Sequence, residues 1–249
     1  MITVTCPEIS NEILKKEDVV FASRPLTMGS EVLSRGYLTT VVVPLGDQWN
    51  KMKRIMVGEL FSQARHRWLH DKRVEEADIL VRYVHNQCNK NADHEGGLVN
   101  LRAVAQHYCG NVIRKLVFSR RYMGKGKGDG GPGVEEEEHV QAIFTILAHI
   151  FSFCISDYIP CLRGLDLEGH EKVMEGATRV LAKYHDPIIN DRIQQWREGK
   201  QEGPEDLLDV LISLKDDNEE SLLSTKEIKA QIIISFSYSF FLLAYIGII

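Results

Sequence analysis

The 249-residue sequence predicts a mainly α-helical protein. Beyond the first sixty residues, apolar side chains recur in steps of three and four, which is the spacing of one buried helix face. The composition, 44% hydrophobic and 26% charged, is that of a globular protein. A net charge of −5 gives no reason to expect a nucleic-acid partner. The five cysteines are an odd number without CxxC spacing, which favours free thiols.

Four long helices form the predicted core. Their apolar stripes are, in chain order, Ala77, Leu80, Val81, Val84 and Cys88; Leu101, Val104, Ala105, Tyr108, Val112 and Leu116; Val140, Ile143, Phe144, Leu147, Phe151 and Cys154; and Val173, Ala177, Val180, Leu181, Tyr184 and Ile188. Asn100 is a suitable N-cap for the second of these helices. Pro187 is expected to kink or end the fourth.

Two further helices are predicted near the C-terminal end. Pro204 suits the first turn of one, and Ser224 with Glu227 has the spacing of a capping box for the other. This last helix leads into residues 232–249, eighteen residues without a charge. That length reaches the lower limit for a membrane span, so the segment is either an anchor or a buried helix.

Two other features have the spacing of a site. Residues 126–131, "GKGDGG", match a dinucleotide-binding pattern, but that pattern has meaning only between a strand and a helix. Four glutamates, Glu135–Glu138, follow it and would repel phosphate. We therefore interpret residues 126–131 as a flexible loop and the four glutamates as a solvated acidic face. His66 and His70 have metal-ligand spacing without a third ligand, which favours a solvated or capping role.

The stretch "PLGDQWNKMKRIM" is the strongest candidate for a binding site. On a helix, Trp49 and Lys53 share one face and present an indole N–H and an ammonium to an anion. Arg54 follows directly and adds a second cation. The alternative is an aromatic anchor with a lysine whose stem lies along it.

This stretch resembles the helix C signature of the cytochrome P-450 enzymes, W-x-x-x-R preceded by a P-x-G turn. Other stretches agree in order, among them "FASRPLTMGSEVLSRGYLTTVVVPLGDQW", "RHRWLHDKRVEEAD", "HYCGNVIRK", "DGGPGVEEEEHV" and "DYIPCLRGLDLEGHEK". Together they are similar to the plant amino-acid N-monooxygenases, which convert amino acids to aldoximes. The resemblance extends from about the N-terminus to Gln231.

The resemblance implies a haem-thiolate monooxygenase in which Trp49 and the cation at position 53 contact the haem propionates. Lys53 stands where the family usually has arginine. A single ammonium group, assisted by Arg54, therefore replaces a guanidinium that could make two parallel hydrogen bonds to a carboxylate. Candidate substrate-facing residues are Leu38, Thr39, Thr40, Val41 and Phe153. The implied partners are an amino acid and an NADPH-cytochrome reductase at the cytoplasmic face of the endoplasmic reticulum membrane.

The sequence also departs from the family. Residues 1–231 predict a partial cytochrome P-450 domain, from helix B to the start of helix I, truncated before the haem-ligand half. Residues 232–249 lack the acidic and hydroxyl-bearing oxygen-binding segment, and no cysteine lies in an F-x-x-G-x-R-x-C-x-G context. We also expect this chain to lack the family's N-terminal anchor. We therefore expect this chain to be inactive; the alternative is a helical interaction protein anchored in a membrane through residues 232–249.

Overall fold

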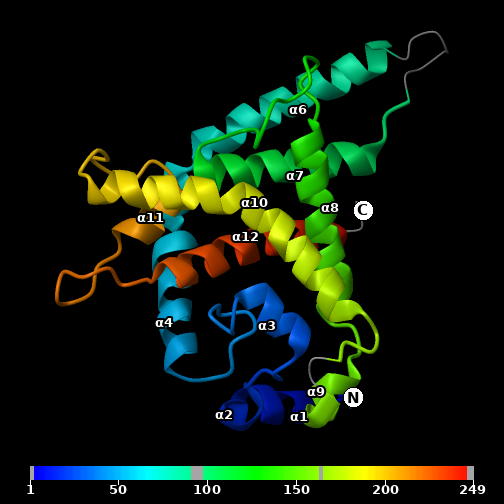
Figure 1. Ribbon diagram of the computed structural model, residues 1–249, viewed down its shortest axis with the longest axis vertical. Coiled ribbons are helices and arrows are strands. Elements are labelled where there is room, and N and C mark those ends of the chain that lie inside the picture. Colours follow the sequence, from blue (N-terminus) through cyan, green and yellow to red (C-terminus); the bar gives the residue numbers. More distant parts are fainter. Residues whose placement is uncertain (1–2, 91–97, 163–164, 246–249) are drawn as a thin grey trace.

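The computed structural model describes residues 3–90, 98–162 and 165–245 and confirms a mainly helical fold (Figure 1). The elements are α1 (Pro7–Asn11), η1 (Glu12–Lys16), α2 (Asp18–Phe21), α3 (Met28–Ser34), α4 (Asp47–Ile55), η2 (Met56–Leu60), α5 (Gln63–Trp68), α6 (His70–Lys90), α7 (Leu101–Phe118), α8 (Val134–His149), α9 (Ile155–Tyr158), η3 (Pro160–Leu162), α10 (His170–Arg197), α11 (Leu207–Ser213) and α12 (Thr225–Tyr245). Within the described ranges the extended pairing is one isolated bridge, between Lys215 and Ser221.

Helix ends show where local sequence signals decided the structure. The Asn100 side chain accepts a hydrogen bond from the backbone N–H of Ala103, so the predicted cap of α7 is confirmed. The prediction that Pro204 lies in the first turn of a helix is wrong, because α11 begins at Leu207 with Asp206 as its cap. Helix α10 continues through Pro187 to Arg197, and Figure 1 shows it changing direction along its length, as expected of a proline.

Helix α12 is the centre of the molecule (Figure 1). It contacts α3, α7, α8, α10 and α11, and its buried apolar side chains include Ile228, Ile232, Ile233, Ile234 and Phe236. Each fully buried side chain of this size contributes about 1.5–3 kcal/mol. The first part of the uncharged segment is therefore a core helix. No helix in the described parts of the chain has the length and hydropathy needed to cross a membrane.

The predicted apolar stripes locate the long helices but misplace parts of their buried faces. Val81, Leu101, Phe151 and Val173 are exposed rather than buried. Polar side chains occupy the buried positions instead: Glu76, His107, Asn111, Arg114, Glu136, His139 and His185. An apolar periodicity cannot reveal these residues, because their burial depends on polar partners, most of which lie outside their own helix.

The acidic run differs from expectation at Glu136, whereas the glycine-rich stretch and the two histidines agree with the favoured interpretation. Residues 126–131 lie in the connection between α7 and α8, without the strand that a dinucleotide site needs. Glu136 is buried, not solvated, because its carboxylate accepts hydrogen bonds from the backbone N–H groups of Met123 and Gly133. His66 and His70 are both exposed, in agreement with a solvated role, and they belong to different helices, α5 and α6.

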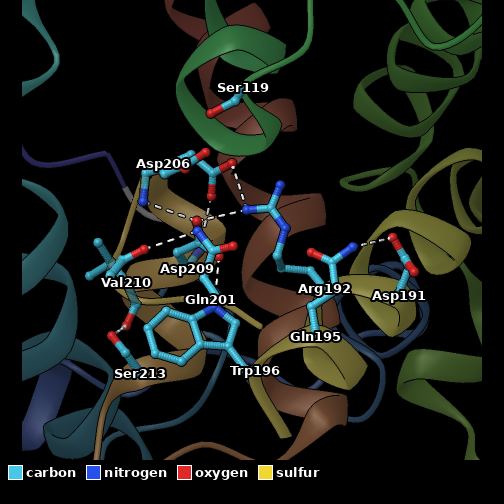
Figure 2. Close-up of polar contacts among 12 residues, drawn as sticks. Ser119, Asp191, Arg192, Gln195, Trp196, Gln201, Asp206, Asp209, Val210 and Ser213 are labelled. Atoms are coloured by element: carbon cyan, nitrogen blue, oxygen red, sulfur yellow. Dashed lines mark hydrogen bonds and ion pairs between the residues drawn. The ribbon is translucent and has the colours of Figure 1, made fainter. Parts of the chain in front are cut away.

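A cluster of ionic hydrogen bonds joins α10 to α11. Figure 2 shows the carboxylates of Asp206 and Asp209 near the guanidinium of Arg192 and the indole of Trp196. Arg192 Nη1 lies 2.7 Å from Asp209 Oδ2 and 3.3 Å from Asp206 Oδ2, while the Trp196 indole donates to Asp209 Oδ1 at 2.7 Å. Asp206 also caps α11 by accepting from the Asp209 backbone N–H at 3.0 Å. Both carboxylates are buried and paired, so this cluster fixes the angle between the two helices.

A pair of histidines joins α8 to α10 in the core. The Nε2 atoms of His139 and His185 lie 2.8 Å apart, and both rings contact the Phe236 ring of α12. Burial, followed by the nearby charge of Arg114, lowers the pKa of His185 to about 3. Burial also holds the pKa of His139 well below its ordinary value. Both rings are therefore neutral near pH 7, and one donates its N–H to the other.

Candidate functional site

Helix α4 brings the first candidate residues together. Lys53 Nζ lies 4.3 Å from the centre of the Trp49 ring, so the predicted shared face is confirmed. Lys53 and Arg54 are exposed, whereas Met52 and Ile55 on the opposite face are buried in the core. The helix therefore holds an indole and two cations at the surface on an apolar base.

Glu227 fastens α4 to the beginning of α12. Its carboxylate accepts from Lys51 Nζ at 2.7 Å and from Gln48 Nε2 at 2.9 Å. It also accepts from the Ser224 backbone N–H at 2.8 Å, which confirms the predicted capping box. Burial raises the pKa of this carboxyl, but the contacts with Lys51, Gln48 and Ser224 outweigh burial and lower the pKa to about 2. Glu227 is ionised at neutral pH and holds both helices.

The candidate substrate-facing residues 38–41 lie in the connection between α3 and α4. The Leu38 carbonyl accepts from Gln48 Nε2 at 3.1 Å, so the same glutamine contacts this segment and Glu227. Thr39 is fully buried, and Thr40 is half-buried. Val41 lines an apolar cavity of about 420 Å³ together with residues that include Leu60, Ile113 and Ile234.

Phe153 lies apart from these residues. It follows α8, is 65% exposed, and stacks on Tyr158 of α9 with ring centres 5.2 Å apart. Helix α9 is joined to the start of α3, where the Met28 backbone N–H donates to Asp157 Oδ1 at 2.7 Å. The structure thus groups residues 38–41 with α4 and α12 but places Phe153 at α9.

Comparison with known proteins identifies the family. The family model described as cytochrome P-450 matches residues 1–237. The chain belongs to the cytochrome P-450 family. It is 56% identical over 231 residues to a tryptophan N-monooxygenase of Prunus mume, which covers 93% of this chain and 43% of the relative. It is also 56% identical over 233 residues to isoleucine N-monooxygenase 1 of Lotus japonicus, covering 94% of this chain and 44% of the relative.

A third relative is the phenylalanine N-monooxygenase of Arabidopsis thaliana, 51% identical over 233 residues that cover 93% of this chain and 44% of the relative. The chain thus spans less than half the length of these cytochrome P-450 relatives. The family match ends at residue 237, within α12 and six residues beyond the predicted boundary at residue 231.

The family's cofactor is haem, and the surface of α4 suits its carboxylates. Exposed Lys53 and Arg54 are charged donors, and the half-buried Trp49 adds an indole N–H. Arg54 also lines a cavity of about 340 Å³ with Lys215, Asp216 and Asp217 among its other walls. These donors match the charge of haem propionates.

Sequence reasoning missed Gln48 and Lys51 as parts of this site. The capping box was a local signal for Glu227. Its other partners, Gln48 and Lys51, lie on α4, and Lys51 is 176 residues away from Glu227 in the chain. Such pairs follow from packing, and a single sequence carries no local sign of them.

Proposed function

We propose that this chain is part of a haem monooxygenase that N-hydroxylates an amino acid. The supporting observation is the identity of 51–56% over more than nine-tenths of the chain with relatives that are each named as an amino-acid N-monooxygenase. In this proposal, bound haem supplies oxygen activation, with electrons from an NADPH-cytochrome reductase. The product class is an aldoxime, formed by two successive N-hydroxylations.

The proposal gives each candidate residue a role. Lys53 and Arg54 bind the haem propionates from α4, and Trp49 adds its N–H and shields the Lys53 ammonium. Residues 38–41 form the wall toward the amino acid, and Gln48 fixes this wall to the base of α12 through Glu227. Phe153, on its exposed position, belongs to an access region.

A chimera tests this function. Residues 1–237 replace the matching segment in isoleucine N-monooxygenase 1 of Lotus japonicus, whose remaining length is kept. We expect the chimera, expressed with a reductase, to give a thiolate-type Soret band with carbon monoxide and to form an aldoxime. The unmodified relative is the control. A chimera that shows the Soret band but forms no aldoxime from any of the twenty amino acids would contradict the proposal.

A further inference from the structure

One carboxylate, that of Asp186, joins three elements beside the segment to which the proposed function gives the substrate. Asp186 lies on α10, and its Oδ1 accepts from Nη2 of Arg35, the residue directly after α3, at 3.2 Å. Its Oδ2 lies 3.0 Å from Lys229 Nζ on α12. The side chains of Lys229 and Asp186 are 14% and 29% exposed, so solvent screens this contact less than it screens an ion pair at the surface. Each oxygen of Asp186 therefore holds a cation from a different element.

The backbone at Arg35 has an unfavourable conformation. Arg35, Gly36 and Tyr37 have φ angles of 54°, 96° and 61°, so three successive residues form a left-handed turn. Glycine adopts this conformation readily, but a residue with a Cβ adopts it only where neighbouring groups hold it. Ser34 Oγ holds Tyr37 by accepting from its backbone N–H at 2.7 Å, and Asp186 holds the side chain of Arg35. The turn therefore depends on side-chain contacts, one of which comes from α10.

Residues 38–41 follow this left-handed turn directly and are connected to α12 by two routes. In the first route, the first carbonyl of the segment accepts from Gln48 Nε2 at 3.1 Å, and Gln48 also donates to Glu227 at 2.9 Å. The second route runs through the turn and Asp186 to Lys229, two residues beyond Glu227 on α12. The Gln48 route fixes a single carbonyl of the segment. The direction in which the segment leaves the turn therefore depends on the Asp186 route.

From these contacts we infer that Asp186 is a positioning residue for the amino-acid substrate. Asp186 acts through the chain rather than by touching the substrate: it holds Arg35 on one side and α12 on the other, and so fixes the turn from which residues 38–41 extend. This inference rests on the proposed role of residues 38–41 as the substrate wall. Without the charge of Asp186, Arg35 and Lys229 lose their common partner and repel each other. The turn then relaxes, and the wall moves relative to α12.

Hydrogen exchange in the 249-residue chain tests the positioning step. Tyr37, Leu38, Val42 and Val43 each donate a backbone hydrogen bond, so exchange of their amide protons measures how often this segment opens. Asp186→Asn keeps the shape of the side chain and removes its charge. We expect it to accelerate this exchange about fivefold or more, while the amides of α11 exchange as in the parent. Unchanged exchange, or an equal acceleration throughout the chain, would overturn the inference.

Asp191→Asn is the matched control. Asp191 is exposed on the same helix and accepts from Gln195 Nε2 at 2.9 Å, so its replacement should leave the exchange of the segment unchanged. Asp186→Glu keeps the charge and should exchange more slowly than Asp186→Asn. Arg35→Gln removes the ion pair from its other side and should accelerate exchange to a similar degree as Asp186→Asn. Unchanged exchange in Arg35→Gln refutes the inference even if Asp186→Asn fails to fold.

Kinetics of the chimera that contains residues 1–237 test the consequence for the substrate. We expect Asp186→Asn in this chimera to raise the KM for the amino acid about fivefold or more and to change kcat by less than about twofold, because the wall binds the substrate and takes no part in oxygen activation. The Soret band with carbon monoxide should match that of the parent chimera. A parent chimera that forms no aldoxime contradicts the proposed function itself. A parent chimera that forms aldoxime, with the same KM in Asp186→Asn, overturns this inference alone.

Discussion

Acid should destabilise this protein through the histidine pair of α8 and α10. His139 and His185 are neutral in the folded state because burial lowers both pKa values, to about 3 for His185. In the unfolded chain a histidine titrates near pH 6.5. Between these values the unfolded state binds protons that the folded state excludes, so the free energy of unfolding falls as the pH falls below 6.5.

The size of the effect follows from linkage. Each buried neutral histidine costs about 1.4 kcal/mol of stability for each pH unit below 6.5, until its folded-state pKa is reached. From pH 6.5 to pH 4.5 the loss is about 3 kcal/mol for His185, and His139 adds to the loss because burial lowers its pKa as well. Domains of this kind are stable by roughly 5–15 kcal/mol, so the loss at His185 alone is a substantial part of that stability.

Urea unfolding followed by circular dichroism at pH 7, 6, 5 and 4.5 measures this dependence. The double variant His139→Leu and His185→Leu should lose much less stability over the same range, whereas His66→Gln, an exposed control, should follow the parent. His107 remains in the double variant and retains a part of the slope. If the double variant loses as much stability as the parent between pH 6.5 and 4.5, the neutral buried pair is not the cause. His185→Phe alone provides the same comparison at half the size if the double variant does not fold.

Three other outcomes are expected. In the chimera, Lys53→Gln should weaken haem binding by about 1.5–3 kcal/mol, whereas Lys53→Arg should leave haem binding unchanged or strengthen it. Haem transfer to apomyoglobin measures both effects. An equal loss of haem binding in the two variants would exclude a propionate contact. Glu227→Gln should lower the free energy of urea unfolding at pH 7 by about 2–3 kcal/mol, and Lys226→Gln, nearby and outside the capping box, should change it by under 0.5 kcal/mol. The 249-residue chain with haem and carbon monoxide should show no thiolate-type Soret band, because none of its five cysteines lies in an F-x-x-G-x-R-x-C-x-G context; burial also raises the pKa of the Cys109 thiol to about 11 and that of Cys154 above its usual value. Such a band, lost on replacing one cysteine, would identify a ligand.

Local signals in the sequence determined where helices begin and what class of fold they form. The Asn100 cap and the box of Ser224 and Glu227 act within one turn, so their residues alone specify the hydrogen bonds. The shared face of Trp49 and Lys53 is likewise set by helical geometry. The family also follows from the order of motifs, whereas the haem contacts, the substrate wall and the boundary at residue 231 stay predictions.

Only the tertiary structure decided which polar groups are buried and what they contact. Arg114 and His139 look like surface residues in a pattern of apolar spacing, yet each is fully buried where another helix packs on it. Glu227 meets Lys51 across 176 residues of chain, and no local rule connects them. The uncharged start of the C-terminal segment is a buried core helix because α3, α7, α8, α10 and α11 pack against it. The sequence shows that this segment is apolar and avoids water. Whether lipid or other helices cover its side chains depends on which elements pack against it in the folded protein.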